Sequence, residues 1–155
     1  MELNHSFHFA ASRDILEAFL EHLHDAHFTD SDIDQYEEEF QSENKLVVFF
    51  DSYGSKKEFI NKIKREAKKF NVDFDCSMIN GWSLHGDYTI FCYRHKDNSL
   101  KTFELLPEHK QQVTVIDENT YQFLGVNYSD SDVPGVLGPE MIKHFYRDTY
   151  EELPQ

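Results

Sequence analysis

Residues 55–78 read SKKEFINKIKREAKKFNVDFDCSM, and this stretch predicts a helix followed by a strand. Ser55 and Glu58 have the spacing of a capping box, in which each side chain hydrogen-bonds a free backbone amide at the start of a helix. Apolar residues then recur at the spacing of one helical face: Phe59, Ile60, Ile63, Ala67 and Phe70. After Asn71, apolar and polar residues alternate with the period of a strand: the apolar ones are Val72, Phe74, Cys76 and Met78.

The N-terminal part of the chain predicts the same kind of unit. Residues 3–9 alternate as a strand does, and Ser12 is placed to cap a helix that runs to about Phe28. Residues 33–40 predict an edge strand that carries acids, and residues 45–50, apolar on both faces, predict a central strand. Two interleaved strand–helix–strand units predict a ferredoxin-like split βαβ sheet with both helices on one face.

The C-terminal part predicts further antiparallel strands and one helix. The expected strands are residues 88–95, 100–106, 113–116 and 121–126, the last two forming a hairpin around Glu118 and Asn119. Pro139 suits the first turn of a last helix, whose apolar side is Met141, Ile142, Phe145 and Tyr146. We therefore expect an α+β protein in which antiparallel hairpins extend the ferredoxin-like sheet. It forms a single domain over residues 1–155, with a core at 1–128 and a C-terminal loop and helix at 129–155.

Composition excludes several classes of protein. With 14 Phe and 8 Tyr among 155 residues, the chain is too aromatic for a disordered acidic segment. The longest apolar run, residues 46–50, is too short to cross a membrane, and two cysteines cannot form a disulfide scaffold. The N-terminal sequence MELNHSFHF lacks a basic leader and a long apolar stretch, so a cytoplasmic protein is expected.

Charge is distributed very unevenly along the chain. There are 29 acids against 15 bases, a net charge of −14, yet residues 55–70 carry seven bases and only two acids. Residues 30–43 carry no base and seven acids: Asp30, Asp32, Asp34, Glu37, Glu38, Glu39 and Glu43. An acidic body repels nucleic acid and anionic lipid, and it attracts basic proteins. We therefore expect neither direct nucleic-acid binding nor membrane binding.

The leading hypothesis is a non-catalytic binding protein that occludes a basic surface of a protein partner. The partner would be a nuclease, a toxin or another nucleic-acid-binding protein. Immunity proteins, antitoxins and anti-restriction inhibitors work in this way, with carboxylates in place of phosphates. The seven acids form the predicted contact surface, and Trp82, Phe91 and Tyr93 are its predicted aromatic anchors. A competing interpretation is that the acids keep the protein soluble and guard an edge strand against pairing.

Two further hypotheses come from other classes. A small metal-dependent or acid–base hydrolase would use His24, His27 and Asp25 at the end of the first helix, or the loop around Trp82, which holds Ser83, His85 and Asp87. The sequence contains no phosphate-binding loop, dinucleotide fingerprint or zinc motif, which favours a binding protein without cofactor or metal. Residues 30–34 resemble the start of a calcium loop but lack its later glycine and glutamate. The third hypothesis is a self-assembling structural protein, in which the basic helix of one copy packs on the acidic strand of the next.

The two cysteines are predicted to be buried thiols. If the hairpin between residues 72 and 95 is centred on Leu84, Cys76 and Cys92 are cross-strand neighbours on the core face. Phe91 and Tyr93 would then point away from that core, and this orientation is why they are predicted as anchors.

Overall fold

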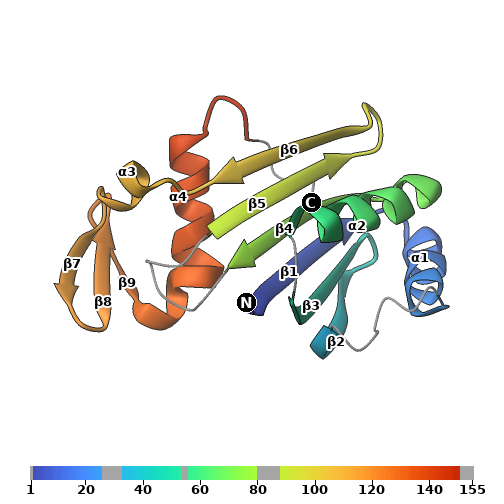
Figure 1. The fold of residues 1–155 in the computed structure, drawn as a ribbon, viewed down its shortest axis with the longest axis horizontal. Helices are drawn as coiled ribbons and strands as arrows, with labels where there is room; N and C mark the ends of the chain where they lie inside the picture. Colours follow the sequence, from blue (N-terminus) through green and yellow to red (C-terminus); the bar gives the residue numbers. More distant parts are fainter. Residues whose placement is uncertain (1, 26–32, 54–55, 80–87, 151–155) are drawn as a thin grey trace.

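The computed structural model describes residues 2–25, 33–53, 56–79 and 88–150 (Figure 1). Within these ranges the chain forms mixed α+β structure with two antiparallel sheets and four α-helices. The larger sheet has six strands in the order β2-β3-β1-β4-β5-β6. Its strands are β1 (Glu2–Ala10), β2 (Ile33–Ser42), β3 (Lys45–Tyr53), β4 (Asp73–Ile79), β5 (Tyr88–Arg94) and β6 (Ser99–Glu104). The predicted α+β class is confirmed.

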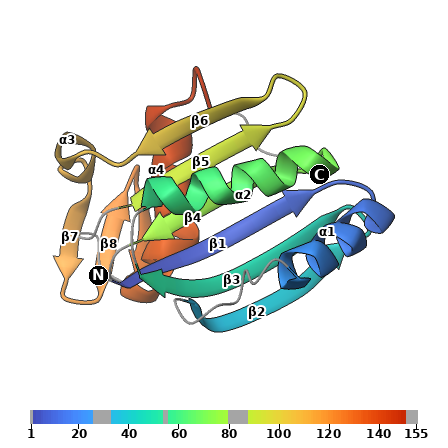
Figure 2. The same cartoon turned by 45° about the vertical axis from the view of Figure 1, so that its right-hand side comes forward.

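Two helices cover one face of this sheet. Helix α1 (Arg13–Asp25) connects β1 to β2, and α2 (Lys56–Phe70) connects β3 to β4. Strand β1 is antiparallel to both β3 and β4, so each helix joins two parallel strands that are separated by a third. Figures 1 and 2 show α1 and α2 on the same side of the sheet. As predicted, β2 is an edge strand and β3 lies inside the sheet. Ser55 and the predicted end of the first helix at Phe28 lie outside the described residues.

Aromatic rings fill the space between the sheet and its two helices. The Phe9 ring on β1 lies 5.0 Å from the Phe19 ring on α1 and 5.9 Å from the Phe74 ring on β4. The apolar stripe of α2 meets the same rings, with Ile60, Ile63 and Ala67 at most 1% exposed. The stripe and the alternating strands thus bury their apolar residues on one face, which we call the helix-covered face.

The other face of β4, β5 and β6 is covered by the C-terminal helix. Helix α4 (Gly138–Phe145) lies behind the sheet in Figure 2, on the side opposite α2. A small sheet packs beside it, formed by β7 (Thr114–Asp117), β8 (Thr120–Phe123) and β9 (Val126–Ser129), with the short helix α3 (Pro107–Lys110) before it. A second apolar cluster joins these parts, for example Ile90, Phe103, Phe123, Met141 and Ile142.

The predicted register of β4 and β5 is wrong by one residue. Cys76 pairs with Phe91, and Asp75 pairs with Cys92. A shift of one residue moves every side chain of a strand to the opposite face. Cys76 therefore lies on the helix-covered face and Cys92 on the other, whereas Phe91 and Tyr93 point into the core beneath the helices.

The predicted strand over residues 121–126 is two strands. Leu124 and Gly125 both have positive φ, 52° and 78°, as in a two-residue hairpin turn, and Phe123 pairs with Val126 across it. The hairpin around Glu118 and Asn119 is confirmed, and β9 adds the strand that the sequence analysis missed.

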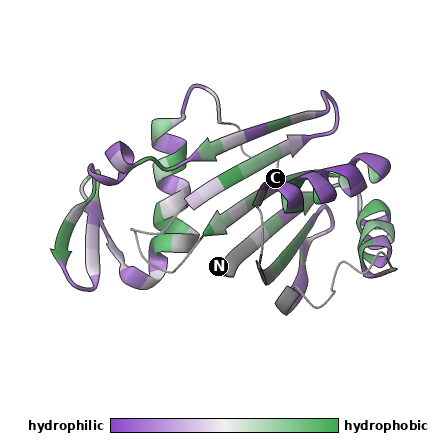
Figure 3. Cartoon of the chain, viewed as in Figure 1, coloured by the Kyte–Doolittle hydropathy of each residue, from purple (hydrophilic) through white to green (hydrophobic). Residues whose placement is uncertain are grey.

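Helix α2 differs in hydropathy from the strands that it covers. Figure 3 shows α2 as mostly hydrophilic, whereas β4 and β5 beneath it carry long hydrophobic stretches. No helix in the described part of the chain is long and apolar enough to cross a bilayer.

Candidate protein-docking surface

The acidic residues of β2 and of the turn that follows it line one edge of the larger sheet. Glu37, Glu38, Glu39 and Glu43 are all exposed. Side chains from Glu37, Glu39 and Glu43 form no hydrogen bond or ion pair with any part of the described chain. Asp34 lies in β2, and Asp30 and Asp32 lie outside the described residues. We call Glu37, Glu38, Glu39 and Glu43 the acidic edge.

Strand register divides the acidic edge between the two faces of the sheet. Glu38 pairs with Val48 and so lies on the helix-covered face, where its Oε2 is 3.1 Å from Nε2 of His24 on α1. Glu37 and Glu39 pair with Phe49 and Val47 and lie on the opposite face. Two carboxylates therefore project from the part of the sheet that α4 does not cover.

An exposed aromatic ring lies beside these two carboxylates. Phe49 on β3 is 42% exposed, between Glu37 on β2 and Ser6 on β1. Sequence analysis missed this residue, because a run that is apolar on both faces predicts burial on both. The available signal was that both helices of a split βαβ unit lie on one face of the sheet, so the other face of this strand had no predicted cover. Phe49 with Glu37 and Glu39 gives an apolar centre with an acidic rim.

Two of the three predicted aromatic anchors, Phe91 and Tyr93, are not on this surface. Tyr93 is 0% exposed and stacks on Phe74 at 5.4 Å, and Phe91 is 8% exposed in the same core. The one-residue register shift explains this difference, because the predicted register directs both rings to the outer face. Trp82 lies outside the described residues, as do Ser83, His85 and Asp87.

A polar row crosses the same face of the sheet next to Val47. His8 on β1 pairs with Asp75 on β4, and Asp75 pairs with Cys92 on β5. Asp75 accepts a hydrogen bond of 2.9 Å from Arg94. Burial and the Asp75 carboxylate both raise the pKa of the Cys92 thiol. A reactive cysteine needs a lowered pKa, so this row does not form a thiolate nucleophile at neutral pH.

His8 gives a testable pH dependence. Burial and nearby Lys45 lower its pKa from 6.5, although Asp75 opposes them. As pH falls below 6.5 the unfolded chain takes up this proton before the folded protein does, so stability decreases. Urea unfolding at a series of pH values should show this loss, at up to about 1.4 kcal/mol per pH unit between the two pKa values. His8→Gln should have a shallower dependence, and an unchanged slope would contradict this role.

Of the three side chains proposed as metal ligands, only that of His24 is described. His24 contacts Glu38, the side chain of Asp25 is not described, and His27 lies outside the described residues. His22, on the other side of α1, hydrogen-bonds Glu66 on α2. Among the described side chains, no group of three His, Cys, Asp or Glu is arranged to hold a metal ion.

Basic charge is concentrated on α2, away from the acidic edge. Burial alone would raise the pKa of Glu66, but hydrogen bonds from His22 and Lys69 hold it below its usual value. This carboxylate belongs to α2 itself, so Lys69 pairs within its own helix at 3.3 Å. The acidic edge and the basic helix α2 are thus two separate surfaces of opposite charge.

No known protein family, curated protein or solved structure matches this chain. The function must therefore be argued from the surfaces described above.

Proposed function

We propose that this chain is a non-catalytic binding protein whose acidic edge docks on a basic surface of a protein partner. The observation that carries the proposal is the group formed by Glu37, Glu39 and Phe49, three exposed side chains on one face of β2 and β3. Exposed carboxylates speed the encounter with a basic protein. A partly exposed aromatic ring adds apolar area that is buried on contact, as in the centre of many interfaces.

The absence of internal partners supports docking over a purely internal role. Glu37, Glu39 and Glu43 make no ion pair within the described ranges, so a partner's lysine or arginine would not have to displace an existing contact. Guarding an edge strand would require only that some charge lie along it. It does not account for an aromatic ring placed beside the charges.

The partner class follows from the charge. A protein that holds nucleic acid presents lysine and arginine where phosphates bind, and the spaced carboxylates of β2 can occupy such sites. A nuclease, a toxin that acts on nucleic acid or a defence enzyme has such a surface. An inhibitor of the immunity, antitoxin or anti-restriction type is therefore the function proposed here. Two free cysteines suit a reducing cytoplasm, which is where we place the protein.

We also propose that the first four strands and two helices have the ferredoxin-like split βαβ topology. The strand order β2-β3-β1-β4 and the pairing of β1 between β3 and β4 support this assignment. Strands β5 and β6 then extend the sheet beyond β4, whereas the hairpin of β7 and β8, predicted to extend it as well, belongs to the separate small sheet. In this arrangement β2 has no neighbour on its outer side among the described strands, so the acidic edge can face a partner.

The double substitution Glu37→Gln and Glu39→Gln should remove most of the binding. The full-length protein is immobilised, exposed to host extract at low salt, and bound proteins are identified by mass spectrometry. The wild type should retain a basic nucleic-acid-binding protein. The variant should retain about tenfold less of it, because two charge pairs disappear. Raising the salt should release it as well.

A matched control distinguishes the effect of the acidic edge on binding from the effect of net charge. Glu108→Gln with Glu118→Gln makes the same change in charge at exposed positions near the small sheet, and it should keep the partner. Equal loss with both variants, or retention that does not depend on salt, would refute the docking surface. Salt-sensitive self-association of the purified protein, seen by sedimentation velocity, would instead indicate assembly through α2 and the acidic edge.

A further inference from the structure

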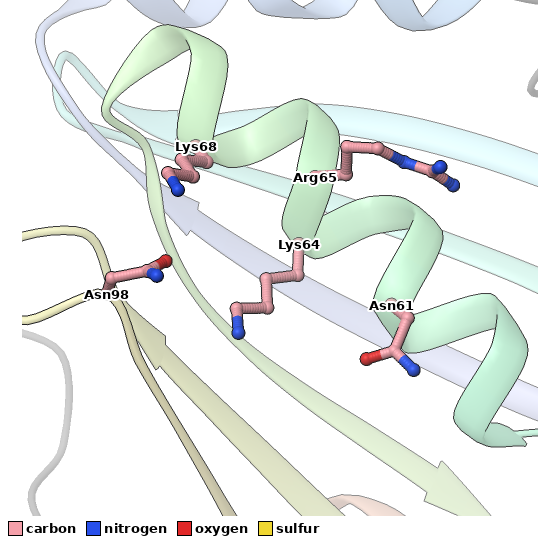
Figure 4. Close-up of a pocket in the computed structure, with 5 residues that line it drawn as sticks. All are labelled: Asn61, Lys64, Arg65, Lys68 and Asn98. Atoms are coloured by element: carbon pink, nitrogen blue, oxygen red, sulfur yellow. The ribbon is translucent and has the colours of Figure 1, made fainter.

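An open groove of about 400 Å³ lies between α2 and the turn that joins β5 to β6 (Figure 4). Its lining is Asn61, Lys64, Arg65, Lys68 and Asn98. This lining contains three cations, two amides and no carboxylate. None of it belongs to the acidic edge, so the groove is a separate surface with the opposite charge.

The cations come from the outward side of α2. Lys64 and Lys68 are four residues apart and therefore lie one helical turn from each other on the same side. In Figure 4 both extend from the side of α2 that faces Asn98, whereas Arg65 extends on the other side of the helix. Lys64 is half-buried, so its stem lies along the protein while its ammonium group reaches the groove.

These cations have no counterion in the described part of the chain. Neither Lys64, Arg65 nor Lys68 forms an ion pair there, although Lys69, next in sequence, pairs with Glu66. Like charges at this spacing repel each other. An anion in the groove would relieve this repulsion.

Asn98 is held in place by a buried ring. It has a φ of 47° in the turn, which asparagine tolerates better than most residues. The phenol of Tyr93, whose side chain is buried, donates to its Oδ1 at 3.3 Å. Because that oxygen is occupied, the amide NH₂ remains as the donor that the turn presents to the groove.

We propose that this groove binds the phosphate group of a compact ligand. A phosphate has several strongly accepting oxygens, which suit two ammonium groups and two amide donors better than a single carboxylate would. A nucleic-acid strand fits less well. Its phosphates would extend past the groove, where a protein of net charge −14 repels them. Physiological salt screens this repulsion only beyond a distance of about 8 Å. Free pyrophosphate and a nucleotide both present this chemistry, and the experiment below distinguishes them.

Titration with pyrophosphate, followed by NMR of the full-length protein at low and constant ionic strength, tests the site. Saturable shifts are expected at the side-chain amides of Asn61 and Asn98. Lys64→Gln with Lys68→Gln should weaken binding by at least about tenfold, since two charge-assisted hydrogen bonds are lost. Lys57→Gln with Lys69→Gln makes the same change of charge on the same helix outside the groove, and it should change affinity by less than about twofold.

Asn98→Asp provides a second variant that keeps the acceptor for Tyr93 and suits the turn. Its carboxylate should repel phosphate and abolish the saturable shifts, whereas Gln112→Glu, the same charge change elsewhere, should leave them intact. If the lysine variant does not fold, this pair decides the question. ATP binding more tightly than pyrophosphate would identify a nucleotide, and equal binding would identify the phosphate alone; both support the site.

Three results would overturn the proposal. Chemical shifts that grow linearly with pyrophosphate concentration, without saturation, would indicate only non-specific association of anions with the protein. Equal losses in the groove variant and its lysine control would indicate a general effect of charge. Tighter groove-dependent binding of a single-stranded oligonucleotide than of ATP would assign the surface to nucleic acid. These outcomes are independent of the acidic edge, because none of the substituted residues lies in it.

Discussion

Phe9→Ala is expected to lower the free energy of unfolding by about 3 to 5 kcal/mol. Phe9 is 1% exposed and lies in the middle of the helix-covered core. Its ring is 5.2 Å from that of Phe7 and also contacts rings on α1 and β4, so its loss leaves a cavity that three elements border. A domain of this size is stable by only about 5 to 15 kcal/mol, so the variant would lose about a fifth of its stability or more.

Urea unfolding followed by circular dichroism measures this loss. Phe49→Ala is the matched control, because it removes the same atoms from a strand next to β1 at a position that is 42% exposed. It should cost less than half as much, since only part of its ring leaves water on folding. Equal losses for the two variants would mean that Phe9 is not at the centre of the core.

The elements that the sequence predicted best are those with one polar and one apolar face. The stripe of α2 and the alternation of β4 both specify which side chains are buried, and the structure buries them. Ile33–Ser42 was recognisable as an edge strand because it carries a run of acids. In each case local pattern and burial agree, so no information from distant residues was needed.

Register in β5 required information that the local pattern does not contain. Residues 88–93 are all buried, because α2 covers one face of the strand and α4 the other. With no polar face, alternation cannot decide which side of the sheet Phe91 or Cys92 occupies. The error over the two cysteines and over the aromatic anchors has this single cause.

The acidic edge could be predicted in composition but not in orientation. Three consecutive glutamates in a strand must divide between two faces, the first and third together, and an irregularity in the pairing between Asp34 and Glu37 affects which face these two occupy. That irregularity depends on how β2 pairs with β3. It places Glu37 beside Phe49, a contact between strands that no spacing along the chain reveals.

Gly138→Ala is expected to destabilise the protein by about 1 to 3 kcal/mol. Helix propensity alone predicts the opposite, because alanine is favoured over glycine within a helix by about 1 kcal/mol. A Cβ at this position would lie 2.6 Å from ring atoms of Tyr88, which is 3% exposed between β5 and α4. The ring is confined by the second apolar cluster, so relief requires α4 to move away from the sheet.

A double-mutant cycle separates the two effects. In a Tyr88→Leu background the ring is absent, so Gly138→Ala should be neutral or slightly stabilising, and the coupling free energy should be about 1 kcal/mol or more. Thermal unfolding of the four proteins gives this value. If Gly138→Ala raised the stability of the wild type, helix propensity would dominate and α4 would not be packed tightly against Tyr88. Close packing there is what holds the C-terminal helix against the face of the sheet that lies opposite α2.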